Sequence, residues 1–188
     1  MVLLPVDELN ALSTDLSTHF EDGKIRSKQD EEDIIDEMLD LFLLAYANGT
    51  EAANNDLGTD VEIEYDVVEK VVFQVVAGET WRERVERYYR DGGTEYDISR
   101  IAETDLTRIY NTAVLNVAER VGSDGVMKRW ETMMDDRVRD THDYLQSMIV
   151  PYDEDFYTFD GDHARAPGLF TLPENNINCR CTFSLLRG

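Results

Sequence analysis

The sequence predicts an α+β fold, in which a helical N-terminal two-thirds is followed by a small C-terminal α+β domain with a short sheet. Apolar residues recur at helical spacing through about residue 122. Beyond that point the pattern changes to short alternating segments, which is typical of strands joined by loops. The residues that separate these segments are Pro151, Pro167, Gly168 and Pro173.

Two amphipathic helices are expected in the first fifty residues, over Pro5–Phe20 and over about Asp30–Ala47. Glu21-Asp22-Gly23 should end the first helix, and Asn48-Gly49 is a typical stop for the second. The apolar stripes are Leu9, Leu12, Leu16 and Phe20 in the first helix, and Ile34, Ile35, Met38, Leu39, Phe42 and Leu43 in the second.

Three further helices are expected before residue 122. Valines at i, i+4 and i+8 predict a helix over Ile63–Ala77, although their β-branched side chains leave a strand as the alternative. Thr80 and Glu83 form a capping box that begins a helix running to about Arg90. The longest helix is expected over Asp97–Val121, at roughly 36 Å. Residues 51–62 are polar, and their sequence leaves the structure of this stretch open.

The expected helix after Thr80 carries four arginines, which could form a phosphate-binding stripe. Acidic residues precede them at i,i+3 and i,i+4 spacing, in the favourable order. An internally paired, solvated helix face is therefore favoured over a DNA contact. The expected pairs are Glu79–Arg82, Glu83–Arg87 and Glu86–Arg90, and Arg84 completes the four arginines.

The charge is the strongest feature of the composition. Forty acidic residues stand against 18 basic ones, for a formal net charge of -22, and the acids are spread along the whole chain. Many acids and few lysines suggest a halophilic host, because molar salt screens the self-repulsion of such a chain. An ordinary acidic soluble protein is the alternative. A net basic surface, typical of nucleic-acid binders, is missing, so any DNA contact would need a local arginine cluster.

No membrane or secretory role is expected. The longest apolar run, around Leu41–Ala47, is far too short to span a bilayer. The first ten residues lack a basic region ahead of an apolar stretch, which argues against a secretory signal.

The C-terminal third predicts a short sheet. Val126–Thr132 alternates as a strand does, and Thr141–Gln146 indicates a short helix. Further strands are expected at Ile149–Val150, Phe156–Phe159 and Cys179–Leu185.

Several short motifs in this region resemble the Mu F-like head-morphogenesis family of tailed viruses. They are Arg129-Trp130-Glu131-Thr132, then Asp136-Arg137-Val138-Arg139 followed by His142 and Leu145, and finally Asn178-Cys179-Arg180-Cys181. Upstream, Ala102-Glu103-Thr104-Asp105 and Tyr110-Asn111-Thr112-Ala113 are similar to the long helix of that family. The resemblance covers about residues 79–186. Two departures are Ser147, where the family usually has glycine, and Glu103, where it has arginine.

The resemblance implies a minor head protein, present in few copies, that binds the portal inside the capsid near the portal vertex. Other head proteins and packaged DNA are further implied partners, with the host cytoplasm as the compartment during assembly. We divide the chain into a helical, portal-binding arm over residues 1–78, long helices over 79–122, and the family's α+β domain over 123–188. The apolar stripes of residues 5–47 are the expected portal contact.

A zinc site is the sharpest chemical hypothesis. His142, Cys179 and Cys181 are candidate ligands, with His163 as a possible fourth, because imidazole and thiolate groups are the ligands that zinc prefers. Arg139 argues against a cation there. The alternative is that both cysteines pack as small apolar groups on a buried strand face and that His142 is a hydrogen-bonded structural residue. No disulfide is expected, because cysteines separated by one residue need strained geometry to bridge.

An enzyme is the second functional class. Asp135, Asp136, Asp140 and Asp143 lie around His142 and could supply acid/base groups, but an acidic surface scatters such clusters widely. Arg137 and Arg139 are instead expected to neutralise these aspartates and to hold the short helix on the sheet. No catalytic or cofactor-binding residue is therefore assigned. The alternative is an injected effector or a toxin-like hydrolase or transferase, whose fold a zinc ion could support.

Overall fold

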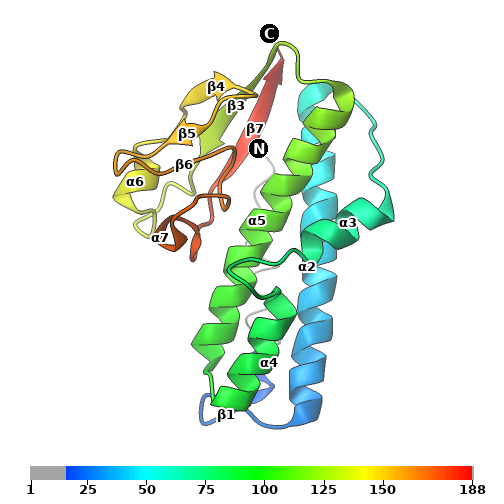
Figure 1. Ribbon diagram of the computed structural model, residues 1–188, viewed down its shortest axis with the longest axis vertical. Coiled ribbons are helices and arrows are strands. Elements are labelled where there is room, and N and C mark those ends of the chain that lie inside the picture. The colour runs from blue at the N-terminus through cyan, green and yellow to red at the C-terminus, as the bar shows by residue number, and fades with distance from the viewer. Residues whose placement is uncertain (1–15, 188) are drawn as a thin grey trace.

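Two long helices that run in the same direction are the largest elements of the fold (Figure 1). The computed structural model describes residues 16–187. Helix α2 spans Lys28–Leu57 and helix α5 spans Glu95–Val121. They start close together, since the backbone N–H of Glu95 donates to the carbonyl of Gly23. The connecting helices α3 (Tyr65–Val72) and α4 (Trp81–Asp91) return the chain to that end.

A small hairpin precedes α2. Strands β1 (Phe20–Glu21) and β2 (Lys24–Ile25) pair across Asp22 and Gly23, whose φ values of 51° and 74° suit a tight hairpin turn. Most of the helix expected over Pro5–Phe20 lies outside the described residues. Within them, Phe20 already belongs to a strand.

The predicted stop at Asn48-Gly49 is wrong, because α2 continues to Leu57 and ends at Gly58, where φ is 64°. Gly49 serves another purpose. A Cβ atom at this position would lie less than 3.0 Å from the carbonyl oxygen of Tyr110 on α5. Glycine therefore lets the two helix backbones approach closely. Gly49 lies at a helix crossing, although glycine often marks the end of a helix.

The two intermediate helices agree with the sequence in kind. Residues 65–72 are helical rather than extended, although α3 is shorter than the predicted Ile63–Ala77. The chain leaves α3 through Ala77 and Gly78, both with positive φ. Helix α4 begins with the predicted capping box, in which the side chains of Thr80 and Glu83 each accept from the other residue's backbone N–H.

The apolar stripe of α2 is buried inside the protein. Ile34, Met38 and Phe42 are fully covered, and they belong to one core that also includes residues of α5 and of the C-terminal sheet. This core runs from Leu16 to Leu185. These side chains of α2 pack internally and offer no exposed apolar face, and the expected portal contact stays a prediction. Residue 78 does not coincide with a break in the core.

The C-terminal part contains a three-stranded antiparallel sheet in the order β4-β3-β7. Strand β3 spans Val126–Glu131, β4 Ile149–Pro151 and β7 Thr182–Arg187. A second hairpin pairs β5 (Phe156–Tyr157) with β6 (His163–Ala164). Two one-turn helices, α6 (Asp140–Asp143) and α7 (Pro173–Asn176), complete the fold. The α+β class is confirmed; β6 and α7 were not predicted.

A second, smaller hydrophobic cluster lies between the sheet and these short elements. Its buried members are Trp130, Leu145, Phe156, Ala164, Phe170, Cys179 and Cys181. This cluster contains the two cysteines of the candidate functional site.

Across residues 16–187, no helix combines the length and the apolar character that crossing a bilayer requires.

Candidate functional site

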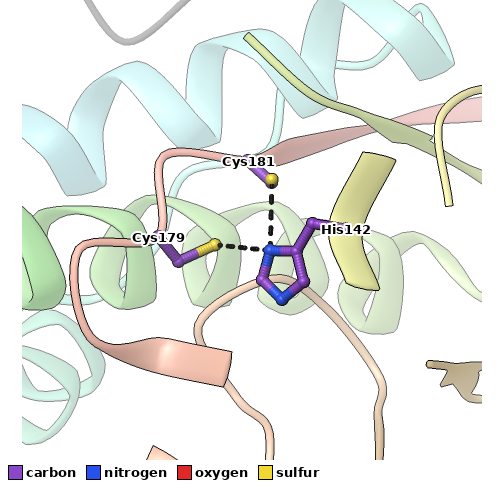
Figure 2. Close-up of side chains that lie close together, drawn as sticks. All are labelled: His142, Cys179 and Cys181. Carbon is purple, nitrogen blue, oxygen red and sulfur yellow. Dashed lines mark hydrogen bonds between the residues drawn. The ribbon is translucent and has the colours of Figure 1, made fainter. Parts of the chain in front are cut away.

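Three of the predicted site residues meet at one point (Figure 2). The Nδ1 atom of His142 lies 3.5 Å from Sγ of Cys179 and 3.5 Å from Sγ of Cys181. The three candidate ligand atoms all lie within 4.8 Å of one another. All three residues are buried, with exposures of 1%, 2% and 3% in that order.

The backbone around the two cysteines is fixed by helix α5. Thr107 donates its hydroxyl to the carbonyl of Cys179, and the Asn111 amide donates to the carbonyls of Cys181 and Pro167. Asn178, with φ of 55°, donates its backbone N–H to Thr104. Because alternate residues of an extended chain point the same way, both thiols face His142.

Helix α6 is fastened to the same place by Arg139. Its guanidinium donates to the carbonyls of Asn175 at 3.0 Å and Ile177 at 2.6 Å. These two hydrogen bonds therefore hold helix α6, and with it His142, close to the extended segment that carries the two cysteines. The expectation that Arg139 neutralises the nearby aspartates is wrong, since its two recorded partners are carbonyl oxygens.

Aromatic rings enclose the imidazole. Trp130 meets His142 edge to face at 5.4 Å between ring centroids, and Phe170 stacks on it at 5.3 Å. Phe156 closes the far side of Trp130 at 5.1 Å. The site thus lies in an apolar shell, where unpaired polar atoms are costly.

A cavity of ≈ 10 Å³ adjoins the three residues, which is about the space of one water molecule. No substrate could enter a space of this size. Its lining residues are Met133, Arg137, Val138, Arg139, His142, Asn178, Cys179, Arg180 and Cys181.

Their surroundings shift the pKa values of the two thiols in opposite directions. A hydrogen bond from Cys181, supported by His142, holds the pKa of the Cys179 thiol well below its usual range despite burial. The same hydrogen bond, together with burial and the charge on Cys179, raises the pKa of the Cys181 thiol.

A cysteine with a lowered pKa beside a histidine can act as a nucleophile in enzymes. Such a nucleophile must reach its substrate. Cys179 is covered by the aromatic shell and has only the ≈ 10 Å³ cavity beside it. This arrangement can bind one atom or ion, or simply pack, but it leaves no room for a reacting group of a substrate.

His163 lies elsewhere, so it does not fit the expectation of a fourth ligand. It belongs to β6, its ring is half exposed, and its Nδ1 atom lies 2.7 Å from Asp155. Among the histidine, cysteine, aspartate and glutamate side chains of residues 16–187, only Cys179 and Cys181 group with His142 as potential metal ligands.

The aspartates near His142 in sequence do not gather around its ring. Asp135 receives both terminal nitrogens of Arg180 at 2.8 Å, and Asp136 is exposed. The Arg137 guanidinium lies 3.6 Å from Glu103 of α5, and its backbone N–H donates to Asp135. The pKa of Asp135 is lowered mainly by the hydrogen bond from Arg180, with a contribution from the charge of Arg137. The hypothesis of an acid/base cluster thus has no geometric support.

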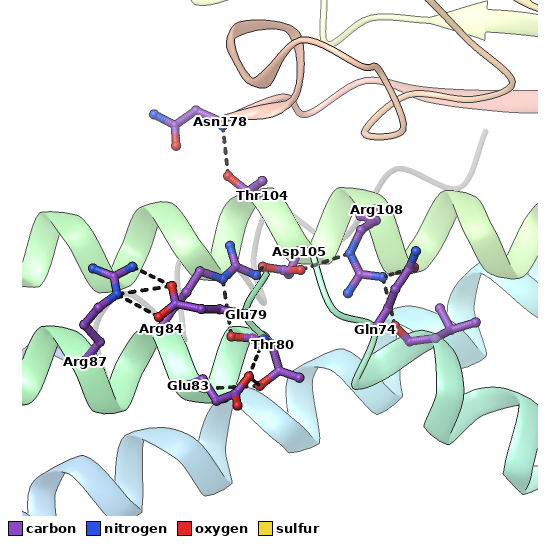
Figure 3. A network of polar contacts seen from close by, with 11 residues as sticks. Gln74, Glu79, Thr80, Glu83, Arg84, Arg87, Thr104, Asp105, Arg108 and Asn178 are labelled. Carbon is purple, nitrogen blue, oxygen red and sulfur yellow. Dashed lines mark hydrogen bonds and ion pairs between the residues drawn. The ribbon is translucent and has the colours of Figure 1, made fainter. Parts of the chain in front are cut away.

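The arginines of α4 are paired, as predicted, but with other partners (Figure 3). Arg87 forms a two-pronged pair with Glu79, and Arg84 reaches the buried Asp105 of α5 at 2.6 Å. Asp105 also accepts from Arg108, whose guanidinium binds the carbonyl of Val71 and the side chain of Gln74. Arg82 pairs with Glu86 and Arg90 with Asp91. All four arginines that could have formed a phosphate-binding stripe on α4 are therefore paired with carboxylates.

Two residues that build the site were missed by sequence reasoning. Asn111 stood in a quoted motif without a role, and its helical position 70 residues before Cys181 gave no sign of their contact. Phe170 lies in a loop between Gly168 and Pro173, where no periodic pattern marks a buried ring.

Comparison with known proteins places the site within a recognised family. The sequence model for "Phage Mu protein F like protein" matches residues 66–184, more than half of the chain. This match confirms the expected family and begins before the motifs quoted above, within α3.

Two known proteins are similar over 64% of this chain. The NAD(+)–arginine ADP-ribosyltransferase EFV of Enterococcus faecalis is 27% identical over 124 residues, which cover 25% of that protein. The minor head protein GP7 of Bacillus phage SPP1 is 25% identical over 123 residues, 40% of its length. The aligned part of the chain thus spans a quarter and two fifths of these relatives. No solved structure matches.

Proposed function

We propose a function from one premise, namely that this chain belongs to the phage Mu protein F-like family: it is a minor head protein that takes part in head morphogenesis of a tailed virus. The family match over residues 66–184 carries the proposal, and the similarity to the minor head protein of Bacillus phage SPP1 supports it. The chain would then reside in the virion, inside the capsid near the portal vertex, after assembly in the host cytoplasm.

The partners we propose are the portal and other head proteins. Because the α2 stripe is buried, the contact must use another surface. Tyr144 and Phe159 come from different loops, pack edge to face at 6.2 Å, and are 59% and 62% exposed. Exposed aromatic pairs are unusual on a surface without a partner, and aromatic side chains often dominate binding energy at interfaces.

The test is co-purification of this chain with the portal protein of the same virus. A Tyr144→Ala/Phe159→Ala double variant should lower capture at least about tenfold, since each hot-spot ring contributes of order 2 kcal/mol. The matched control is Tyr65→Ala/Tyr96→Ala, which removes two exposed rings from the helices. Failure of the wild-type chain to bind portal or any head protein, together with its absence from purified virions, would refute the proposal.

DNA is the weaker of the proposed partners. The net charge is -22, and the α4 arginines face Glu79, Glu86, Asp91 and Asp105. A backbone-tracking protein needs unpaired cations that release counterions from phosphates. A DNA contact would therefore rest on other segments. The acidic composition also supports a halophilic host, and unfolding at low and at molar salt tests that inference.

An enzymatic effector is the second candidate, and it rests on the similarity to the Enterococcus faecalis ADP-ribosyltransferase. Only a quarter of that protein aligns with this chain, so the shared segment is better explained as a common non-catalytic module than as the source of the transferase activity. The purified chain should therefore neither consume NAD+ nor modify an arginine substrate. Turnover in that assay would reverse the order of the two candidates.

A further inference from the structure

Hydrogen bonds among the three groups of the buried site leave one of its polar atoms without a partner. Two sulfur atoms approach Nδ1 of His142 at 3.5 Å, and in either tautomer of the neutral imidazole this atom forms one good hydrogen bond. The Nε2 atom on the other side of the ring is also buried and has no hydrogen-bond partner. This is an expensive arrangement for an apolar shell.

The two nitrogen–sulfur distances are those of a tetrahedral metal centre. With zinc–nitrogen and zinc–sulfur bonds of about 2.0 and 2.3 Å, a tetrahedral angle separates the nitrogen and sulfur ligands by about 3.5 Å. Both observed nitrogen–sulfur distances are 3.5 Å. A single ion between the three atoms would accept all three lone pairs, which resolves the shortage at Nδ1.

A fourth ligand is available at the same place. Asn178 lines the adjoining cavity, and its Oδ1 atom is buried without a hydrogen-bond partner. The cavity of ≈ 10 Å³ has room for about one water between this oxygen and an ion. An oxygen at this side would complete four-coordination while leaving no position for a substrate, as is usual for structural zinc.

The charges permit a cation despite the arginines nearby. Two thiolates neutralise a divalent ion, so the complete site would carry no net charge. Arg139 is engaged by the carbonyls of Asn175 and Ile177, and Arg180 by the carboxylate of Asp135. Neither guanidinium therefore occupies the position of the ion, which answers the objection that Arg139 raises in the sequence.

We propose that His142, Cys179 and Cys181 bind one structural Zn²⁺ ion, with an oxygen at Asn178 as the fourth ligand. The ion would join the α6 loop to the strand that begins at Thr182, two segments separated in sequence by about 40 residues. The hydrophobic cluster between them is small, and small cores commonly rely on a metal or other cross-link. The proposal does not depend on the function in virus assembly.

The experiment measures metal in the full-length purified chain. Elemental analysis after dialysis should give about one zinc per chain, and cobalt substitution should give the thiolate-to-cobalt absorption and the visible bands of a tetrahedral site. Cys179→Ser/Cys181→Ser and His142→Gln should lose at least nine-tenths of the bound metal. His163→Gln removes a histidine outside the group and should keep all of it.

A variant that fails to fold would lose metal for a trivial reason, so a chain with all three proposed ligands intact supplies an independent measurement. In a Trp81→Phe background Trp130 is the remaining tryptophan, and its ring lies 5.4 Å from His142. Cobalt added to metal-free protein should quench its fluorescence with a one-to-one endpoint. Metal-free wild-type protein that stays folded and binds neither zinc nor cobalt would overturn the proposal, as would full zinc in the double cysteine variant.

Discussion

The helical layer and the C-terminal loops are stabilised in different ways. Helices α2 and α5 bury continuous apolar stripes against each other, and their core extends to the sheet. The segment from residue 132 to residue 181 contains only short elements around a small aromatic cluster. There, polar side chains such as Asp162 and Arg139 bind backbone groups that no regular element satisfies. Regular structure satisfies its own backbone, whereas irregular structure must recruit side chains.

This comparison predicts that the helical layer fails globally when the buried charge network around Asp105 is broken. Asp105→Ala leaves Arg108, which is 4% exposed, without its carboxylate partner. Removal of one member of a buried ion pair costs roughly 3–5 kcal/mol. Urea unfolding should show this loss in a single transition that far-ultraviolet circular dichroism and tryptophan fluorescence report together.

Asp66→Ala is the matched control, because Asp66 forms an exposed i,i+4 pair with Lys70 on α3. Its effect should stay below about 1 kcal/mol. Two separate transitions in the Asp105 variant would mean that the two regions unfold independently, which would contradict the continuous core.

Gly49→Ala tests the close approach of the two long helices. Helix propensity alone predicts a gain of about 1 kcal/mol for this change. The structure predicts the opposite sign, since the new Cβ would press on the carbonyl of Tyr110. We expect a net loss of roughly 2 kcal/mol from the shift of one helix against the other.

Asn55→Ala is the control for propensity, because Asn55 is exposed on the same helix. It should raise the free energy of unfolding by a few tenths of a kcal/mol. A stabilised Gly49→Ala variant would show that the helices do not pack as closely as described.

In the C-terminal loops, Asp162 provides hydrogen bonds that a helix or strand would otherwise provide. Its carboxylate accepts from the backbone N–H groups of His163, Thr171 and Leu172 and from the Asn175 amide. Burial alone would raise the pKa of Asp162, but these hydrogen bonds outweigh it and hold the pKa below its usual value. Asp162→Asn should cost about 2 kcal/mol at neutral pH.

The pH dependence follows from the lowered pKa. The carboxylate of Asp162 stabilises the fold fully above its unfolded pKa of about 4, and this contribution is lost as pH falls through the folded value. The difference between wild type and Asp162→Asn should therefore shrink below about pH 4. Asp124→Asn, in an exposed turn, should show neither effect. An unchanged difference in acid would contradict the proposed role of the carboxylate.

The same contrast explains what the sequence could predict. Periodic apolar residues and the Thr80 capping box located the helices, because these signals are local. Gly49 was misread since a glycine looks alike at a helix end and at a helix crossing. His142, Cys179 and Cys181 were identified from residue types and motif order, and the structure brings them together. Their contacts with Phe170 and Asn111 depend on loop paths that no local pattern encodes.

Lys128 gives the smallest expected effect and the finest test of the contrast. Its ammonium is fully buried in the sheet region, where it donates to the carbonyls of Glu154 and Arg165 at 2.7 Å. Burial, with a contribution from Arg165, lowers the pKa of Lys128 to about 8. The folded protein should thus release this proton at lower pH than the unfolded chain, so stability rises between about pH 8 and pH 10.5.

The rise should amount to about 1 kcal/mol between about pH 7 and pH 9, measured as the free energy of unfolding relative to Lys128→Met. Lys70→Met, at an exposed helical position, serves as the control and should leave the pH profile of the wild type unchanged. If the Lys128 variant keeps the alkaline rise, other groups cause it. If the rise disappears, the two carbonyl acceptors compensate only part of the cost of burying the Lys128 charge. The sheet region then relies on contacts between a side chain and the backbone, as the loops do at Asp162.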